Sequence, residues 1–259
     1  MKRRRTAARV IELNAPVLER IRAIKADHPF WGYRRVWAHL RYVDRLDVNN
    51  KRVYRLMKLH GLTVSANTRL KARRTPGRDK PRPTRPNQWW GIDMTKILTR
   101  RGWVQVVIVL DWHSKKFVGW HAGRRATSRD WLAALERACD RQFPVTGIRG
   151  QGVALMSDNG CQPTSLAFMR ACRTLGIKQA FTSYGNPKGN ADTERSIRTL
   201  KEELLWLREW KDEHEVAEAI DQWMPRFNEH YLHSALGYKS PNAFENQHAA
   251  GPNALLNVA

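Results

Sequence analysis

The chain has 259 residues, 42% of them hydrophobic, which leaves room for one core of typical domain size and a small accessory domain and excludes a disordered chain. No apolar run is long enough to cross a membrane, and no apolar stretch of a secretory signal follows the basic start. The net charge of +22 is uneven, since residues 1–88 carry 24 Lys and Arg against 6 Asp and Glu, whereas residues 89–259 carry 22 against 18. A front half that binds a polyanion is therefore predicted, with a solvated basic surface as the alternative.

Three short helices are predicted in residues 1–64. Apolar side chains at helical spacing predict a helix over residues 14–26, with Asn14 as its cap, and a second helix over residues 33–42. A third is expected to follow the cap Asn49. Three short helices with tight links fit a small all-α helix-turn-helix domain.

The third of these helices has a basic face, which is predicted to contact DNA. Such side chains can bind phosphates alone, which positions a protein without reading sequence. Each of them could instead lie on a solvated face. The predicted contacts are Lys51, Arg52, Arg55 and Lys58.

A basic, proline-rich linker is predicted over residues 65–87. This composition cannot build a core and favours an extended, semi-rigid segment. Its positive charge can follow a phosphate backbone, so its binding is expected to weaken steeply with salt. Arg73 and Arg74 are the DNA contacts predicted within it.

From residue 88 onward, strand and helix patterns alternate, which predicts a mixed α/β fold, although the order alone would permit several α/β sheets. The predicted strands cover residues 89–98, 102–110, 116–121, 152–157 and 177–181. The predicted helices cover residues 128–141, 163–175, 191–210 and 213–224, with Pro225 ending or kinking the last of them.

The three cysteines Cys139, Cys161 and Cys172 are odd in number and lack the spacing of a metal site. This pattern favours a reducing compartment and predicts a cytoplasmic protein. Because no cysteine precedes Cys139, the N-terminal domain is expected to fold without cysteine-ligated zinc.

Three carboxylates stand out. Asp158 directly follows a predicted strand, Asp93 lies inside an apolar run where an unpaired charge is costly, and Glu194 lies in the first turn of a predicted helix. Oxygen ligands from separated segments suit hard cations such as Mg²⁺. Two such ions, about 3.5–4 Å apart, can activate a nucleophile and stabilise the leaving oxygen of a phosphodiester. Taken singly, each acid could be an ordinary capping or turn residue.

The order Asp93, then Ser157-Asp158-Asn159-Gly160, then Glu194 resembles the DDE transposases and retroviral-type integrases. Thirty-five residues lie between Asp158 and Glu194. The chain as a whole resembles the second-reading-frame product of bacterial insertion sequences of the third family. The supporting stretches are His28-Pro-Phe-Trp-Gly-Tyr-Arg-Arg-Val36, Val109-Leu-Asp111 and His233-Ser-Ala-Leu-Gly-Tyr-Lys-Ser-Pro241.

The resemblance implies a ribonuclease-H-like, retroviral integrase-type core over residues 88–210 and a C-terminal helical extension over residues 211–259. In such a sheet the first and fourth strands bring Asp93 beside Asp158. The resemblance also implies that these acids and Glu194 bind two Mg²⁺ ions, for which Mn²⁺ can substitute. The implied activity is metal-dependent 3′-end cleavage and strand transfer of an insertion sequence, through single-strand joining and a circular intermediate.

The resemblance further implies partners. These are double-stranded DNA at the element ends and at the target, a second copy of the chain, and an upstream-frame protein as fusion or partner. It places the protein on the nucleoid of a bacterium. Lys188 and Lys201 are expected to approach the DNA, with a solvent-exposed lysine as the alternative for each.

Several alternatives remain open on the sequence. Asp111 could be a fourth ligand, but reads better as a turn former bonded to nearby backbone. Asp192 is expected to interact with the helix N-terminus. Cys161 and Pro163 depart from the family pattern after Asp158 and leave the geometry of that loop open. The competing function is a catalytically silent DNA-binding protein or inhibitor of transposition.

Overall fold

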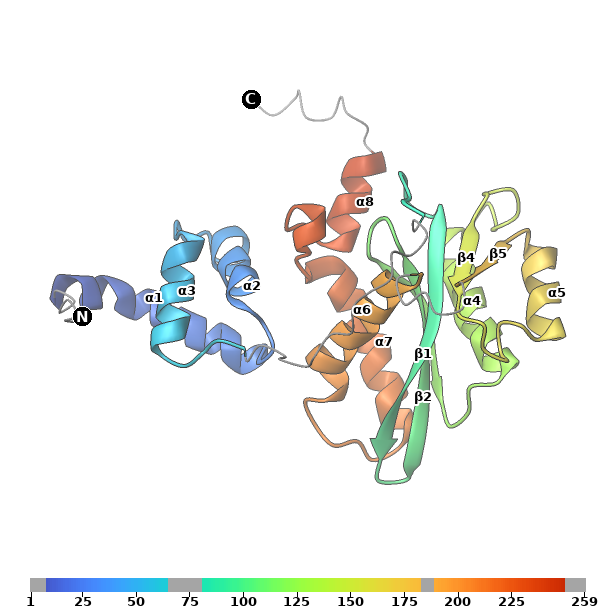
Figure 1. Cartoon of the computed structure of the whole chain (residues 1–259), viewed down its shortest axis with the longest axis horizontal. Helices are drawn as coiled ribbons and strands as arrows, with labels where there is room; N and C mark the ends of the chain where they lie inside the picture. Colours follow the sequence, from blue (N-terminus) through green and yellow to red (C-terminus); the bar gives the residue numbers. More distant parts are fainter. Residues whose placement is uncertain (1–7, 65–80, 183–188, 250–259) are drawn as a thin grey trace, which may run out of the picture. The chain divides into compact units, whose positions relative to one another are not determined.

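The computed structural model describes residues 8–64, 81–182 and 189–249 (Figure 1). It separates into two compact units, Met1–Arg73 and Arg74–Ala259. Among the residues described, no helix is both long and apolar enough to cross a membrane.

The N-terminal unit is a small helical domain built on a few buried apolar side chains. Its elements are α1 (Ala8–Asp27), α2 (Tyr33–Ala38), the π-helix η1 (His39–Val43) and α3 (Asn50–Leu59). The side chains of Ile21, Leu40, Val53 and Met57 are fully buried within it. The predicted second helix is thus present as α2 continued by a π-helical turn.

Two caps predicted in this unit have different outcomes. Asn49 caps α3, since its side chain accepts hydrogen bonds from the Lys51 and Arg52 amides at 2.8 and 3.3 Å. The prediction for Asn14 is wrong, because α1 begins at Ala8 and runs through Pro16. The Asn14 side chain instead accepts a hydrogen bond from Arg52 Nε at 2.8 Å and ties α1 to α3.

The second unit is a five-stranded mixed sheet with the strand order β3-β2-β1-β4-β5. β1, β2 and β3 form an antiparallel meander, and β4 and β5 continue the sheet parallel to β1. The strands are β1 (Trp89–Thr99), β2 (Gly102–Asp111), β3 (Phe117–Gly123), β4 (Ala154–Ser157) and β5 (Lys178–Phe181).

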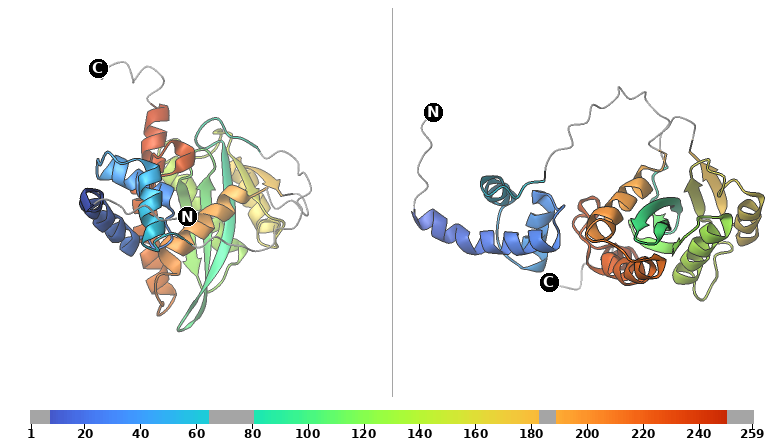
Figure 2. Two further views of the ribbon diagram at one scale, coloured as in Figure 1. Left: turned by 60° about the vertical axis from the view of Figure 1, so that its left-hand side comes forward. Right: turned by 90° about the horizontal axis from the view of Figure 1, so that it is seen from below.

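Helices lie on both faces of this sheet (Figures 1 and 2). One face carries α4 (Ser128–Gln142) and α5 (Leu166–Leu175). The other carries α6 (Ala191–Leu200), the π-helix η2 (Lys201–Leu205) and α7 (Glu213–His230), with α8 (Pro241–Ala249) packed on α7. This is the ribonuclease-H-like, integrase-type arrangement that the sequence predicted.

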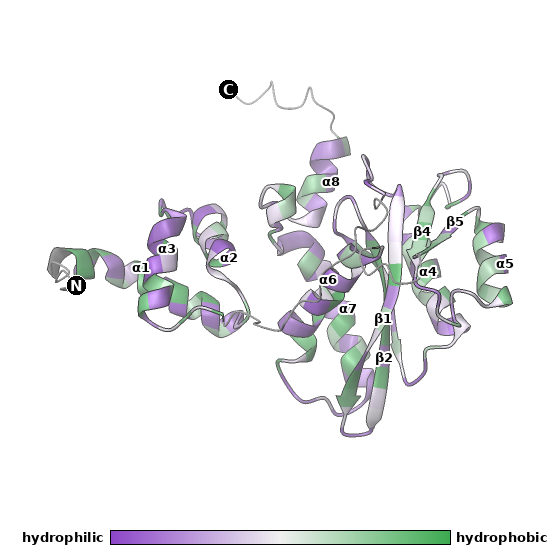
Figure 3. Cartoon of the chain, in the orientation of Figure 1, coloured by the Kyte–Doolittle hydropathy of each residue, from purple (hydrophilic) through white to green (hydrophobic). Residues whose placement is uncertain are grey.

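The main hydrophobic core lies between the sheet and α4 and α5. Hydrophobic and hydrophilic residues alternate along α4 and α5 (Figure 3), as expected of helices that turn one side to a core. The core includes Trp90, Ile92, Val107, Val109, Val118, Trp131, Leu135, Leu155 and Phe168, all at most 1% exposed.

Local capping sets where the core helices begin and end. α4 opens with a capping box between Thr127 and Asp130, and α5 opens on the Ser165 hydroxyl, which accepts from the Phe168 amide. α5 ends at Gly176, whose φ of 71° is the left-handed conformation that glycine adopts without strain. These signals are local, which is why the sequence located these helices well.

Pro225 was predicted to end or kink this helix. α7 continues through Pro225 to His230, so the first of these two alternatives is wrong. An interior proline costs about 3 kcal/mol, which the contacts of the last turn offset. Asn228 accepts a hydrogen bond from the Phe117 amide at 2.9 Å and donates one to the Phe117 carbonyl at 2.8 Å. Phe227 is buried beside them.

The helix predicted over residues 191–210 is interrupted. α6 ends at Leu200, and the π-helical turn η2 closes with the Trp206 amide donating to the Lys201 carbonyl at 2.8 Å. Beyond it Trp210 is buried, and its indole donates to the Leu205 carbonyl at 2.9 Å. Burial of Trp210 therefore overrides the continuous helical pattern of the sequence.

Replacing the cap Asn49 with Ala tests the account of the N-terminal unit. Loss of the two capping bonds is expected to destabilise α3 by about 1 kcal/mol. Hydrogen exchange of α3 peptides, followed by mass spectrometry in the full chain, is expected to quicken roughly fivefold. Peptides of the sheet and the neighbouring variant Asn50→Ala serve as controls, and unchanged α3 exchange in Asn49→Ala would contradict the account.

Candidate active site

The two strand acids are brought together by the parallel pairing of β1 with β4. The ladder pairs Gly91 with Met156, and Asp93 and Asp158 each lie two residues further along. Both acids therefore follow the end of this ladder by the same number of residues, which agrees with the side-by-side placement that the resemblance implies. Because side chains alternate along a strand, Asp93 projects to the same face as Gly91, which is the face covered by α6.

The pKa of Asp93 depends on its burial and on the charges around it. Burial raises the pKa of Asp93 to about 6, and the Met94 amide, which donates to Oδ1 at 2.7 Å, lowers it in part. The negative charges of Asp158 and Glu194 raise this pKa, and the positive charge of Lys201 lowers it. Asp93 thus lies within electrostatic range of both other predicted acids and of one predicted DNA contact.

Asp158 leaves the sheet at the end of β4, where its side chain is exposed. Its Oδ1 accepts a hydrogen bond from the Gly160 amide at 3.0 Å, which closes the turn predicted at Asn159-Gly160. The exposed side chain of Asp158 is therefore accessible to a ligand from solvent.

Glu194 lies in the first turn of α6 and is exposed. This turn lies so close to β1 that a Cβ atom on Gly91 would stand 2.0 Å from Thr193 Oγ1 and 2.3 Å from Trp112 Nε1. The side chain of Asn190, at the start of the helix, donates to the Ile92 carbonyl at 3.4 Å. Only glycine at position 91 admits α6 at this distance.

The three carboxylates have the chemistry of a site for hard cations, but they are not drawn into one coordination sphere. Among the residues described, no three acidic, histidine or cysteine side chains gather closely enough to hold a metal ion. Like charges repel one another at close range. Asp158 and Glu194 are both exposed, whereas Asp93 is partly buried.

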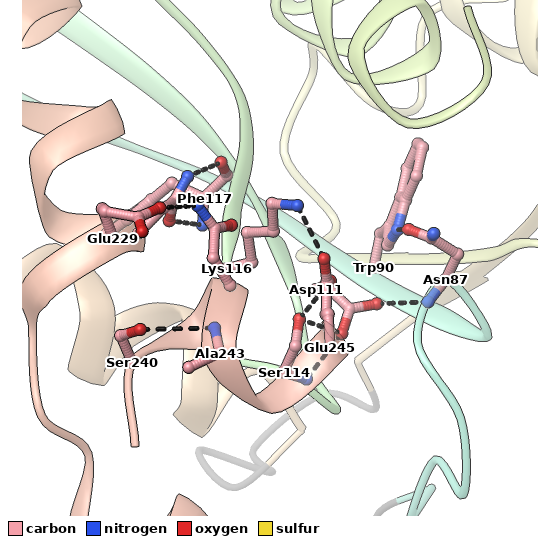
Figure 4. A network of polar contacts seen from close by, with 12 residues as sticks. Asn87, Trp90, Asp111, Ser114, Lys116, Phe117, Glu229, Ser240, Ala243 and Glu245 are labelled. Carbon is pink, nitrogen blue, oxygen red and sulfur yellow. Dashed lines mark hydrogen bonds and ion pairs between the residues drawn. The ribbon is translucent and has the colours of Figure 1, made fainter. Parts of the chain in front are cut away.

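Asp111 is a turn former and not a further ligand (Figure 4). It is 0% exposed; Oδ1 accepts from the amide and hydroxyl of Ser114 at 2.7 and 2.9 Å, and Oδ2 accepts from the Asn87 amide at 2.7 Å. Burial raises its pKa. The Ser114 hydroxyl also lies 2.8 Å from Glu245 Oε1, and Lys116 Nζ binds Glu245 at 2.6 Å, which ties α8 to this turn. The prediction of a local turn is confirmed.

The predicted DNA contacts of α3 differ in their surroundings. The guanidinium of Arg52 donates to Asn14 and to the Leu13 carbonyl, so it serves packing within the unit. The remaining three side chains are exposed; they are Lys51, Arg55 and Lys58.

Lys201 lies beyond the end of α6, with its ammonium group 5.8 Å from the centre of the Trp206 ring. Its charge acts on Asp93, which places it near the acids, and its contact with DNA stays a prediction. The other predicted contacts lie outside the described residues; they are Arg73, Arg74 and Lys188.

Sequence reasoning missed the residues that seat α6. Asn190, Thr193 and Trp112 read as ordinary polar or core residues. Gly91, inside an otherwise apolar strand pattern, was the available signal, because glycine within a strand often marks a close approach of another segment.

Replacing Gly91 with Ala tests this close approach. The added methyl group would collide with Thr193 and Trp112 and force α6 outward, at an expected cost of about 1–3 kcal/mol in the free energy of unfolding. Gly123→Ala is the matched control, since its Cβ would meet only the flexible His121 ring at 3.3 Å. Urea unfolding of both variants measures the difference, and equal stability of the two would contradict the account.

The pKa of Asp93 predicts a pH dependence of stability. Its value rises from 3.8 to about 6 on folding, so the folded protein binds the proton more tightly between these pH values. The resulting stability is present below pH 3.8 and is lost as the pH rises through about 6. Asp93→Asn removes this loss. Its free energy of unfolding is therefore expected to exceed that of the wild type by roughly 2 kcal/mol at pH 7.5, with little difference at pH 4.

Urea unfolding between pH 4 and 8, in the presence of a chelator, measures this difference. A stability gap between Asp93→Asn and the wild type that is constant across this range, or that narrows as the pH rises, would contradict the assignment.

Comparisons with known proteins agree with this architecture. The family described as "Integrase core domain" matches residues 83–187 and, in a second form, residues 175–241, and the family described as "HTH-like domain" matches residues 12–70. A chain in the cryo-EM structure of a simian T-cell lymphotropic virus intasome, in complex with the PP2A regulatory subunit B56 gamma, has a similar fold. It has a TM-score of 0.51 at 16% identity, over 80% of this chain and 73% of that one.

Two curated relatives span most of the chain. The transposase for insertion sequence element IS904 of Lactococcus lactis is 31% identical over 208 residues, which is 76% of this chain and 80% of the relative. The transposase InsD for insertion element IS2A/D/F/H/I/K of Escherichia coli is 28% identical over 243 residues, 90% of this chain and 79% of the relative. With its helix-turn-helix-like domain and integrase-type core, the chain belongs to the family of insertion-sequence transposases.

Proposed function

We propose that this transposase cleaves the 3′ ends of its insertion sequence and transfers them to target DNA at a site formed by Asp93, Asp158 and Glu194. The observation that carries the proposal is the convergence of three separate elements. β1 and β4 present two acids at adjacent positions, and the first turn of α6 lies against β1 at Gly91. The charges of both other acids act on Asp93.

The donor set fits two Mg²⁺ ions, with Mn²⁺ as a substitute. All three groups offer carboxylate oxygens, which hard divalent cations prefer. When bound, such ions supply an activated nucleophile and neutralise the charge on the leaving oxygen. The acids act as ligands and not as nucleophiles, so no covalent bond forms between protein and DNA.

The reaction then has two steps of the same kind. Water attacks the phosphodiester at the element end, the P–O bond to the 3′ oxygen breaks, and that oxygen leaves with a proton as a free 3′-hydroxyl. The 3′-hydroxyl next attacks a phosphodiester of the target, forms one P–O bond and displaces another 3′ oxygen. Asp93 has to be ionised to act as a ligand, and Lys201 favours that ionised form.

The basic front half supplies the DNA contacts in this proposal. Lys51, Arg55 and Lys58 are exposed on α3 and would bind phosphates of the duplex. Lys201 would contact the reacting end. Two element ends have to meet for transposition, which supports a complex of at least two copies, and the upstream-frame protein remains the proposed fusion or partner.

Replacing Asp158 with Asn tests the proposal. Loss of one ligand charge is expected to lower strand transfer in Mg²⁺ by on the order of 10³-fold, which corresponds to several kcal/mol of transition-state stabilisation. Asp140→Asn, which changes an exposed aspartate of α4, is the matched control and should retain full activity. Undiminished transfer by Asp158→Asn would refute the assignment.

Calorimetry with Mn²⁺ separates the proposal from its alternative. The wild type is expected to bind Mn²⁺, and Asp158→Asn to bind it far more weakly. A wild-type chain that binds DNA but no Mn²⁺ would instead be a silent DNA-binding protein or an inhibitor of transposition.

A further inference from the structure

The turn between β2 and β3 holds the part of α6 that carries Glu194. We call residues 111–115 the β2–β3 turn. Within it, Trp112 Nε1 donates a buried hydrogen bond to Thr193 Oγ1 at 3.0 Å. Lys115 Nζ lies 3.1 Å from Asp192 Oδ2, with the two side chains only 20% and 34% exposed. The two residues directly before Glu194 are thus each bound to this turn.

This contact adds a partner for Asp192. That carboxylate lies in the first turn of α6, where it was expected to interact with the helix N-terminus. It forms an ion pair with Lys115 of the β2–β3 turn. Half-buried ion pairs of this kind fix geometry better than fully exposed ones, which are weak.

β1 holds the same turn of α6 from a second side. Asn190 donates to the Ile92 carbonyl at 3.4 Å, and the Glu194 amide donates to the Asn190 carbonyl at 3.0 Å. Gly91 allows the close packing of Thr193. Contacts from β1 and from the β2–β3 turn therefore converge on residues 190–193, while the Glu194 side chain is left exposed.

The β2–β3 turn is itself rigidly held, so it can serve as a support. Asp111 accepts hydrogen bonds from the amide and hydroxyl of Ser114 and from the Asn87 amide. Lys115 donates to the Trp112 carbonyl at 2.5 Å. The Trp112 ring stacks on Trp89, with centroids 5.9 Å apart and planes at 12°. Glu245 of α8 joins the same network through Ser114 (Figure 4).

We propose that Trp112 and Lys115 are positioning residues, which set where Glu194 stands relative to Asp93. Residues within one helical turn move together, so fixing Asp192 and Thr193 fixes the backbone of Glu194. A ligating carboxylate has to be placed to within roughly 0.5 Å. The inference rests on the proposed function, because it assigns a supporting role to residues around the same site.

Thr193→Val is the central test variant, because valine keeps the shape of threonine and removes only the oxygen that accepts from Trp112. Thr193→Ser keeps the hydroxyl and should restore the wild-type properties. Thr199→Val is the matched control. Thr199 is also buried on α6, but its hydroxyl bonds only the Arg195 carbonyl one turn earlier, at 3.2 Å.

The first measurement uses the full chain without metal. Hydrogen exchange of peptides that cover residues 190–197 is expected to quicken at least about fivefold in Thr193→Val, because the anchoring bond of this turn is lost. Exchange in Thr193→Ser is expected to stay within about twofold of the wild type. In Thr199→Val the same peptides should also remain near the wild-type rate.

The second measurement is Mn²⁺ binding by calorimetry together with strand transfer. Loss of a supporting contact around a metal ligand typically lowers affinity about 10–100-fold, and Thr193→Val is expected to fall in this range. Lys115→Met, which keeps the aliphatic stem and removes the charge, is expected to weaken Mn²⁺ binding in the same direction. Thr193→Ser and Thr199→Val should bind as the wild type does.

The outcomes distinguish a failure of the positioning role from a failure of the proposed function. If the wild type transfers strands and Thr193→Val matches Thr199→Val in exchange, Mn²⁺ binding and transfer, the positioning role is overturned and the proposed function stands. If the wild type behaves like Asp158→Asn, the proposed function is overturned, and the positioning of a ligand by the β2–β3 turn falls with it.

Discussion

The structure of the candidate site depends on the seating of α6 against β1 at Gly91. A side chain at this position would stand 2.0 Å from Thr193, so the absence of a Cβ atom decides whether the helix can approach. Once the helix is there, Asn190 and Thr193 bind the neighbouring backbone and indole. The parallel pairing of β1 with β4 is the second constraint on the candidate site, because it brings the strand ends that carry Asp93 and Asp158 together.

At Asp93, the packing of the fold opposes the ionised state of the carboxylate. Burial and two neighbouring carboxylates raise the pKa of Asp93 to about 6, which disfavours the ionised form that a cation would require. Buried Asp111 differs from Asp93, because it accepts three hydrogen bonds from its turn and from Asn87. Stability lost at Asp93 is thus a local cost that a bound cation would offset.

The errors made from the sequence share one cause, which is that distant contacts outweighed local preference. Pro225 should stop a helix, yet the double hydrogen bond between Asn228 and Phe117, which lie 111 residues apart, keeps α7 going to His230. Burial of Trp210 likewise ends the helical run after η2. Where the signal was local, as at Asn49, the sequence located the start of the helix correctly.

By itself, the sequence determined the order of strands and helices in the core and the basic front half, because these follow from composition and periodicity, and its motif named three candidate acids. The tertiary structure alone decided what binds the first turn of α6. The bonds from Trp112 to Thr193 and from Lys115 to Asp192 join residues 81 and 77 positions apart, and no pattern within either segment indicates its partner. Such pairings exist only once the sheet has formed and brought the β2–β3 turn against α6.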